Sequence, residues 1–160
     1  MHELSGKTTF QLVGATATAG IPHGAWLAES LNLPLIYVRG ASKSHGSGKR
    51  VEGAFKPNDR VLLIEDLVTT GMSSLSAVEA LRVEGLRVDT AISLFQYGLP
   101  GVRERFNEAG IKLSSVLTLD ELLDEASNIG TLSTSQVLTV KAWQKNPVQW
   151  NDRFISGIRR

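Results

Sequence analysis

The sequence contains no cysteine, which excludes disulfide bonds and cysteine-ligated zinc. It has no apolar run long enough to span a bilayer, and its first residues lack the basic-then-apolar order of a secretory signal. Neither sign of charge is in excess, since 17 basic and 16 acidic residues leave a net charge of +1. A broad basic field for nucleic acid is therefore absent. We expect a cytoplasmic protein with neither a nucleic-acid nor a membrane partner.

The 160 residues, 42% of them hydrophobic, are enough to bury a core without covalent links, so we expect one domain over residues 1–160. Short apolar runs rich in β-branched residues alternate with helical patterns. This alternation predicts an α/β fold with a mainly parallel twisted sheet flanked by helices. The expected strands are 8–14, 35–38, 60–65, 88–95 and 116–117. The expected helices are 21–32, 73–84, 102–109, 119–126 and 133–145.

A long segment from Gly40 to Gly53 interrupts this alternation. It has four glycines among serines and basic residues, and almost no apolar side chain. Connections of this length inside a compact domain are usually functional or disordered. Composition alone leaves both readings open, a functional loop and a plain surface loop.

The most informative stretch is residues 61–74. Four apolar residues, Val61–Ile64, predict a strand buried on both faces, and it ends in Glu65 and Asp66. Small hydroxyl residues and a glycine follow before the next helix. Open α/β folds bind ligands at the carboxyl ends of their strands, and a helix N-terminus favours phosphate. The stretch therefore suits a sugar phosphate, with acids for the ribose and N–H donors for the phosphate. The alternative is an ordinary strand end followed by an ordinary helix cap.

Other phosphate-binding motifs do not fit. No window matches the G-x-x-x-x-G-K-[ST] pattern of the P-loop. The dinucleotide fingerprint needs three spaced glycines after the first strand, whereas Gly14 and Gly20 stand alone there.

Residues 65–73 resemble the phosphoribosyl pyrophosphate signature of type I phosphoribosyltransferases. Further segments resemble the orotate branch of that family: Ala17–His23, Tyr37–Arg39 leading into Lys43–Gly46, Val51–Gly53 and Trp143–Trp150. The resemblance runs from about Phe10 to Trp150. It implies the type I phosphoribosyltransferase fold with a flexible catalytic loop. Because few residues precede Phe10, the N-terminal hood of that family is expected to be mostly absent.

By this resemblance, the chain is an orotate phosphoribosyltransferase of pyrimidine (UMP) biosynthesis. It would join orotate to phosphoribosyl pyrophosphate, giving orotidine 5′-monophosphate and pyrophosphate. The implied cofactor is Mg²⁺, held through the substrate diphosphate and water rather than by dedicated protein ligands. The implied assembly is a homodimer in which the loop of one subunit reaches the active site of the other.

The resemblance also assigns roles to residues. Lys43, His45 and Asp66 would be catalytic. The ribose hydroxyls would be held by Glu65 and Asp66, and the 5′-phosphate by residues 69–73. The full phosphoribosyl pyrophosphate site would be Arg39, Lys43, His45, Glu65, Asp66, Leu67, Val68, Thr69, Thr70, Gly71, Met72 and Ser73. Thr69 would also approach orotate.

Some positions depart from the family pattern. The loop lacks a second lysine before Lys43, Gln96 stands near the place of a base-binding arginine, and Met72 replaces a glycine or threonine. If position 72 required a positive φ, methionine would be strained there. These departures leave two alternatives: a weakly active or non-catalytic relative that binds phosphoribosyl pyrophosphate or a nucleotide, and a transferase for another base.

Overall fold

The structure is a computed structural model that describes residues 9–40 and 49–158, with side chains up to residue 152. A six-stranded sheet has the order β3-β2-β1-β4-β5-β6. All neighbouring strands are parallel except β3, which pairs antiparallel with β2. The strands are β1 (Leu12–Thr16), β2 (Leu35–Val38), β3 (Val51–Glu52), β4 (Arg60–Val68), β5 (Arg87–Gln96) and β6 (Lys112–Thr118). The predicted α/β fold with a mainly parallel sheet is confirmed.

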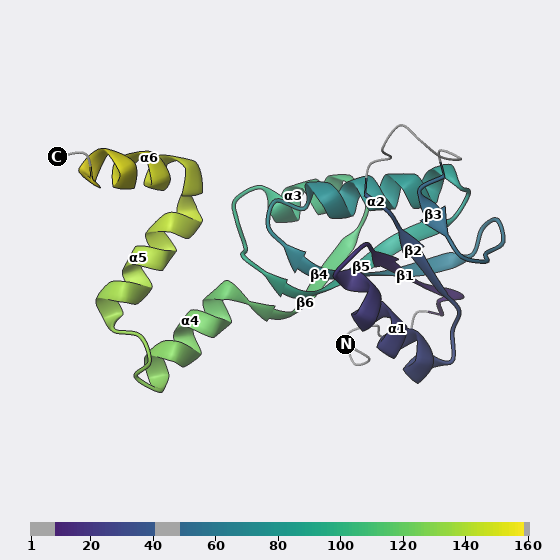
Figure 1. Ribbon diagram of the computed structural model, residues 1–160, viewed down its shortest axis with the longest axis horizontal. Coiled ribbons are helices and arrows are strands. Elements are labelled where there is room, and N and C mark those ends of the chain that lie inside the picture. Colours follow the sequence, from purple (N-terminus) through teal and green to yellow (C-terminus); the bar gives the residue numbers. More distant parts are fainter. Residues whose placement is uncertain (1–8, 41–48, 159–160) are drawn as a thin grey trace.

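Helices cover both faces of the sheet (Figure 1). They are α1 (Gly20–Leu31), α2 (Met72–Val83), α3 (Val102–Glu108), α4 (Leu119–Asn128), α5 (Thr134–Lys145) and α6 (Pro147–Ile158). Helix α1 lies on one face, where Leu27 and Ala28 pack against Leu62 and Ile64 of β4. Helices α2 and α3 lie on the opposite face, where Leu81 and Phe106 join a second apolar cluster with β4.

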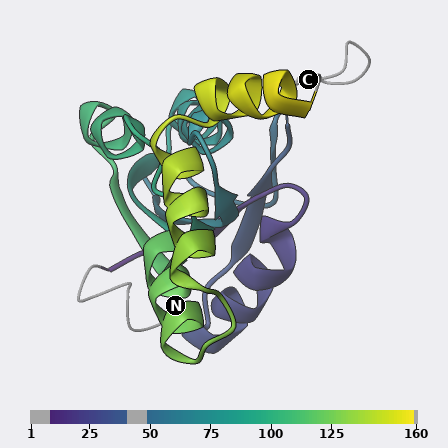
Figure 2. The ribbon, with the colours of Figure 1, turned by 90° about the vertical axis from the view of Figure 1, so that its left-hand side faces the viewer.

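Helices α4 to α6 extend beyond the end of β6 as an arm (Figures 1 and 2). The arm is joined to the sheet by a third apolar cluster, in which Phe95 and Tyr97 pack near Trp143. Tyr97 meets both rings edge to face, and its carbonyl accepts a hydrogen bond of 2.7 Å from Gln144. Within the described residues, no helix is long and apolar enough to cross a membrane.

The predicted strands and helices all occur, but several bounds differ. Strand β1 ends at Thr16 rather than residue 14, and β4 continues to Val68 because Leu67 and Val68 still pair with Phe95 and Gln96 of β5. Strand β6 is longer than the predicted 116–117. Strand β3 and helix α6 were not predicted from the sequence.

Candidate active site

The site is located by the order of the strands. From the central pair β1 and β4, the chain connections run outwards in opposite directions, to β2 on one side and to β5 and β6 on the other. Such a switch point leaves a crevice at the carboxyl ends of the two central strands, and open α/β folds bind ligands there. The turn after β1 leads into α1, and the turn after β4 leads into α2. Residues 17–19 and 69–71 therefore flank the crevice.

The two helices that begin at this crevice are not capped by side chains. Helix α1 starts after Ala19 and α2 after Gly71, and within the described residues neither has a capping side-chain bond or an acidic residue in its first turn. By contrast, α4 and α5 have complete capping boxes, from Thr118 and Ser133 respectively. In the first turn of α2 the backbone N–H groups of Met72 and Ser73 are thus available, whereas in α1 Pro22 has no N–H and that of Ile21 donates to the Thr18 carbonyl oxygen. The positive ends of both helix dipoles favour an anion.

The turn after β4 is held in shape by α3. Gly71 has φ +78°, and a Cβ atom at this position would lie 2.5 Å from the Phe106 ring. The Arg105 guanidinium donates two hydrogen bonds, of 2.9 and 3.3 Å, to the Thr70 carbonyl oxygen. Thr69 and Thr70 are exposed beside the first turn of α2. The support from Arg105 and Phe106 was not predicted, because nothing in the sequence pairs residues 70 and 105.

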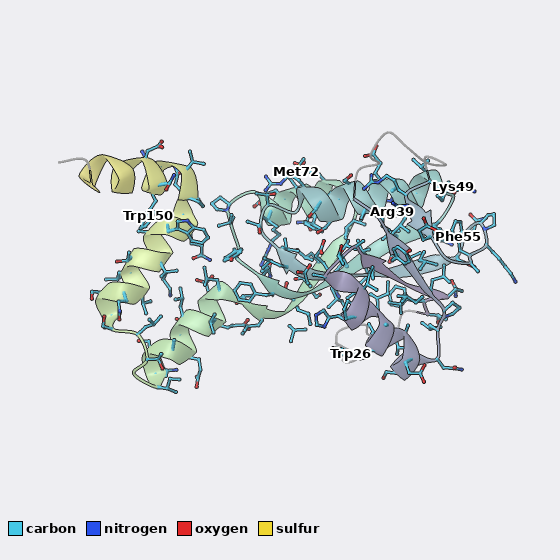
Figure 3. All side chains as sticks on the ribbon, viewed as in Figure 1. Trp26, Arg39, Lys49, Phe55, Met72 and Trp150 are labelled. Atoms are coloured by element: carbon cyan, nitrogen blue, oxygen red, sulfur yellow. The ribbon has the colours of Figure 1, made fainter. Side chains whose placement is uncertain are left out.

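Met72 is the first residue of α2, and its side chain is 61% exposed at this end of the helix (Figure 3). The positive φ of the turn falls on Gly71, one residue earlier. Methionine at position 72 is therefore not strained, and its backbone N–H lies in the first helical turn together with that of Ser73.

The two acidic residues at the end of β4 differ in their surroundings. Glu65 is 5% exposed, and its two oxygens accept hydrogen bonds from the hydroxyls of Thr16 and Ser74, the latter of 2.7 Å. Burial raises the pKa of Glu65 above its ordinary 4.5, the two hydroxyls counteract this rise in part, and neighbouring Asp66 adds to it. Asp66 is partly exposed. Of the two predicted ribose ligands, Asp66 is the accessible one.

Beyond Asp66, the predicted contact residues point in different directions. Leu67 is 37% exposed, whereas Val68 is 1% exposed and belongs to the apolar core. The side chain of Val68 is thus part of the fold, and its backbone pairs with β5, where its carbonyl oxygen accepts a hydrogen bond from the Tyr97 N–H.

Arg39 directly follows β2, and its side chain is exposed (Figure 3). The preceding strand end is tied to the crevice, since the N–H of Ala17 donates a 2.8 Å hydrogen bond to the Val38 carbonyl oxygen. Arg39 forms a surface ion pair of 3.3 Å with Glu52. Exposed pairs of this kind stabilise little, so the guanidinium can exchange Glu52 for another anion at low cost. Lys43 and His45 lie outside the described residues.

Among the described residues, no group of three or more acidic or histidine side chains could hold a metal ion. Mg²⁺ commonly keeps several waters and takes one or two carboxylates together with substrate oxygens. A partly exposed carboxylate at the crevice, Asp66, fits an ion that arrives with a diphosphate substrate.

Comparisons with known proteins point to one family. The chain is 43% identical to an orotate phosphoribosyltransferase of Lactobacillus johnsonii, over 91% of this chain and 68% of the relative. It resembles the structure of Leishmania donovani UMP synthase with a TM-score of 0.76 and 26% identity, over 89% of this chain and 31% of the larger one. It also resembles a Mycobacterium tuberculosis orotate phosphoribosyltransferase solved with phosphoribosyl pyrophosphate, with a TM-score of 0.64 and 28% identity, over 76% of this chain and 70% of that one. No family model matches the chain.

Proposed function

This chain belongs to the orotate phosphoribosyltransferase family, and from that membership we propose that it transfers the phosphoribosyl group of phosphoribosyl pyrophosphate to orotate. The products would be orotidine 5′-monophosphate and pyrophosphate. The observation that supports this most directly is the turn at residues 69–71, in which Thr69 and Thr70 are exposed and which leads into the uncapped N-terminus of α2 near Asp66. Phosphate and ribose groups need these two features side by side.

In this proposal the backbone N–H groups and hydroxyls of residues 69–73 bind the 5′-phosphate. Asp66 accepts hydrogen bonds from the ribose hydroxyls and so orients the anomeric carbon. The bond from that carbon to the diphosphate breaks as the bond to orotate forms, and positive charge develops on the sugar ring. A carboxylate near the ring and cationic side chains near the leaving diphosphate stabilise this distribution of charge. We propose Arg39, whose exposed side chain directly follows β2, for the second task, together with Lys43 and His45, which the sequence predicts.

Mg²⁺ is part of the same proposal, with Asp66 as its accessible protein carboxylate. When bound, the ion would neutralise charge on the leaving diphosphate. The homodimer with loops shared between subunits, the approach of Thr69 to orotate and the cytoplasmic location remain predictions.

The direct test is the consumption of orotate, followed by absorbance, in the presence of phosphoribosyl pyrophosphate and Mg²⁺. We expect turnover by the unaltered chain, and loss of about 100-fold or more in kcat/KM for Asp66→Asn, because a carboxylate that orients the sugar acts mainly in the transition state. Asp124→Asn is the matched control, since Asp124 lies on α4 in a surface pair with Lys141. It should leave the rate within about twofold.

The same assay, run with several bases and together with a calorimetric measurement of phosphoribosyl pyrophosphate binding, separates the alternatives. Binding of phosphoribosyl pyrophosphate without turnover of any base would support a non-catalytic relative. Turnover with uracil or a purine in place of orotate would support a transferase for another base. Equal rates for Asp66→Asn and the unaltered chain would contradict the assignment of Asp66.

A further inference from the structure

Gln144 is a buried amide of the arm that reaches back to the sheet. It lies in the last turn of α5 and is only 9% exposed. Its Nε2 atom donates a 2.7 Å hydrogen bond to the carbonyl oxygen of Tyr97, which directly follows β5. The same atom lies 3.5 Å from a carboxylate oxygen of Asp120, in the first turn of α4. One side chain therefore joins the ends of β5, α4 and α5.

The residues next to Gln144 and Tyr97 favour this contact. Gly98 has φ +63°, and a Cβ atom there would lie only 3.3 Å from the Nε2 atom of Gln144, so glycine leaves room for the amide. The ring of Trp143 meets the Tyr97 ring edge to face, with 5.4 Å between the centroids. Two consecutive residues of α5 thus hold Tyr97, one through its backbone and one through its ring.

The peptide held by Gln144 is connected to the candidate site. The Tyr97 N–H donates a 3.1 Å hydrogen bond to the carbonyl oxygen of Val68, and Val68 directly precedes the 69–71 turn. Gln96, the residue before Tyr97, is in register with Val68. A displacement of the Tyr97 peptide would therefore move the ends of β4 and β5 together.

A cavity of about 440 Å³ lies at this end of β5. Its wall includes Gln96 and Gly98 on one side and Asp120 on the other. The Gln144 amide bonds to both parts of this wall, through the Tyr97 carbonyl and the Asp120 carboxylate. A buried amide with two acceptors fixes their separation, because losing the donor would leave the Tyr97 carbonyl without this partner.

Helix α3 supports a different part of the same turn. Arg105 donates both of its hydrogen bonds to the carbonyl oxygen of Thr70, which faces the start of α2. The arm acts one step earlier, at Val68, through Tyr97. The turn after β4 therefore has two supports, one on each side of Thr69.

From this geometry we infer that Gln144 is a positioning residue for the base, which acts through the Tyr97 peptide, whereas α3 supports the phosphate end of the site. Thr69 and Gln96, which the resemblance places near the base, are the chain neighbours of the two residues that this peptide hydrogen bond joins. The inference rests on the proposed function, because the site has a base end only if its ligand carries a base on the ribose.

The test compares two ligands that differ in the base. Orotidine 5′-monophosphate and ribose 5-phosphate share the ribose and the phosphate, so the ratio of their dissociation constants reports on the base. Gln144→Met keeps the length of the side chain and removes the donor. We expect the dissociation constant of the nucleotide, measured by calorimetry, to rise about fivefold or more, and that of ribose 5-phosphate to stay within about twofold.

Two further variants separate positioning from a general loss of structure. Arg105→Met should weaken both ligands by about the same factor, since both carry the 5′-phosphate. Lys141→Met is the matched control on α5, where Lys141 forms a surface pair with Asp124, and it should weaken neither ligand.

Gln144→Glu tests the donor itself. It places an acceptor opposite the Tyr97 carbonyl and the Asp120 carboxylate, so it should weaken the nucleotide more than Gln144→Met does. Equal weakening of both ligands by Gln144→Met, or no weakening of either, would overturn the inference. Should Gln144→Met fail to fold, Gln144→Asn, whose amide is one methylene shorter, gives the same comparison.

The proposed function fails separately from the inference. Tighter binding of the nucleotide than of ribose 5-phosphate by the unaltered chain, without turnover of orotate, would contradict the proposed function alone, and the binding comparison would still decide the role of Gln144. Normal turnover of orotate with unchanged binding in Gln144→Met would overturn the inference alone. If the unaltered chain did not prefer the nucleotide to ribose 5-phosphate, both would be overturned.

Discussion

The burial of Glu65 shows what a sequence can and cannot indicate about a single residue. Adjacent acidic residues at the end of an apolar strand predict an edge of the sheet where a ligand can bind. Their different surroundings depend on Thr16, which lies 49 positions earlier in the chain and next to Glu65 only because β1 and β4 are neighbours. A local pattern cannot contain this information, so both carboxylates were assigned the same role from the sequence.

The raised pKa of Glu65 predicts how stability depends on pH. Because the folded chain holds this proton more tightly than the unfolded chain does, the carboxyl stabilises the fold most below its ordinary pKa of 4.5. This contribution is lost as the pH rises through the folded value. Glu65→Gln cannot ionise, so its free energy of unfolding, relative to the unaltered chain, should increase as the pH rises from about 4.5. Urea unfolding of both proteins at several pH values measures this difference.

Asp89 provides a control, because its pKa is shifted in the opposite direction to that of Glu65. Partial burial raises the pKa of Asp89. The hydrogen bond and the charge of Arg60 lower it by more, so the net shift of the pKa is downwards. The Asp89 contribution is present above the ordinary pKa of 3.8 and is lost as the pH falls through the folded value. The free energy of unfolding of Asp89→Asn should therefore fall furthest below that of the unaltered chain at neutral pH. A difference between Glu65→Gln and the unaltered chain that is independent of pH would contradict the shift of Glu65.

At the scale of elements, buried runs were predictable and their ends were not. Val61–Ile64 identified β4, and the Ser133 capping box placed the start of α5 correctly. Strand β3 has only two residues and forms only because β2 offers an edge, so its own sequence has no period to detect. Helix α6 was missed because proline at position 147 suggests the end of a helix, whereas here it begins the next one.

The turn between β4 and α2 can be tested as a unit by Gly71→Ala. The positive φ strains alanine, and the added Cβ would press against Phe106, so the turn must shift. We expect the free energy of unfolding to fall by about 1–3 kcal/mol and phosphoribosyl pyrophosphate to bind more weakly. Urea unfolding and calorimetry measure the two effects.

Gly130→Ala is the matched control for Gly71→Ala. Gly130 has a similar φ of +73° after α4, but nothing lies within 4 Å of its Cβ position. Gly130→Ala should lower the free energy of unfolding through backbone strain alone and leave ligand binding unchanged. If Gly71→Ala bound phosphoribosyl pyrophosphate as tightly as Gly130→Ala does, the 69–71 turn would not be the phosphate site.

At the scale of the whole molecule, the predicted shared active site can be tested by mixing two inactive variants. Lys43→Ala and Asp66→Asn should each lose most activity, whereas substitution of Lys49, an exposed lysine of the same 40–53 segment, by alanine should not. If Lys43 acts in the neighbouring subunit's site, a hybrid dimer has one site with both defects and one with none. Mixing equal amounts after subunit exchange should then restore about a quarter of the normal rate.

Failure to recover any activity, although mixed dimers form, would show that Lys43 serves its own subunit. The two substitutions are suitable because positions 43 and 66 lie in different segments of the chain, so each can be supplied by a different subunit. The expected recovery follows from the statistics of random pairing alone.

The N-termini of α1 and α2, which lack side-chain caps, affect how the carboxyl edge of the sheet attracts its ligand. Much of the attraction comes from backbone peptide groups, which do not titrate. Their N–H donors remain after any substitution except one to proline. A protein with a net charge of only +1 can thus retain a local preference for polyphosphates across the whole pH range in which it stays folded. Inorganic polyanions in a buffer should for the same reason compete with the substrate, whatever the acidity of the solution.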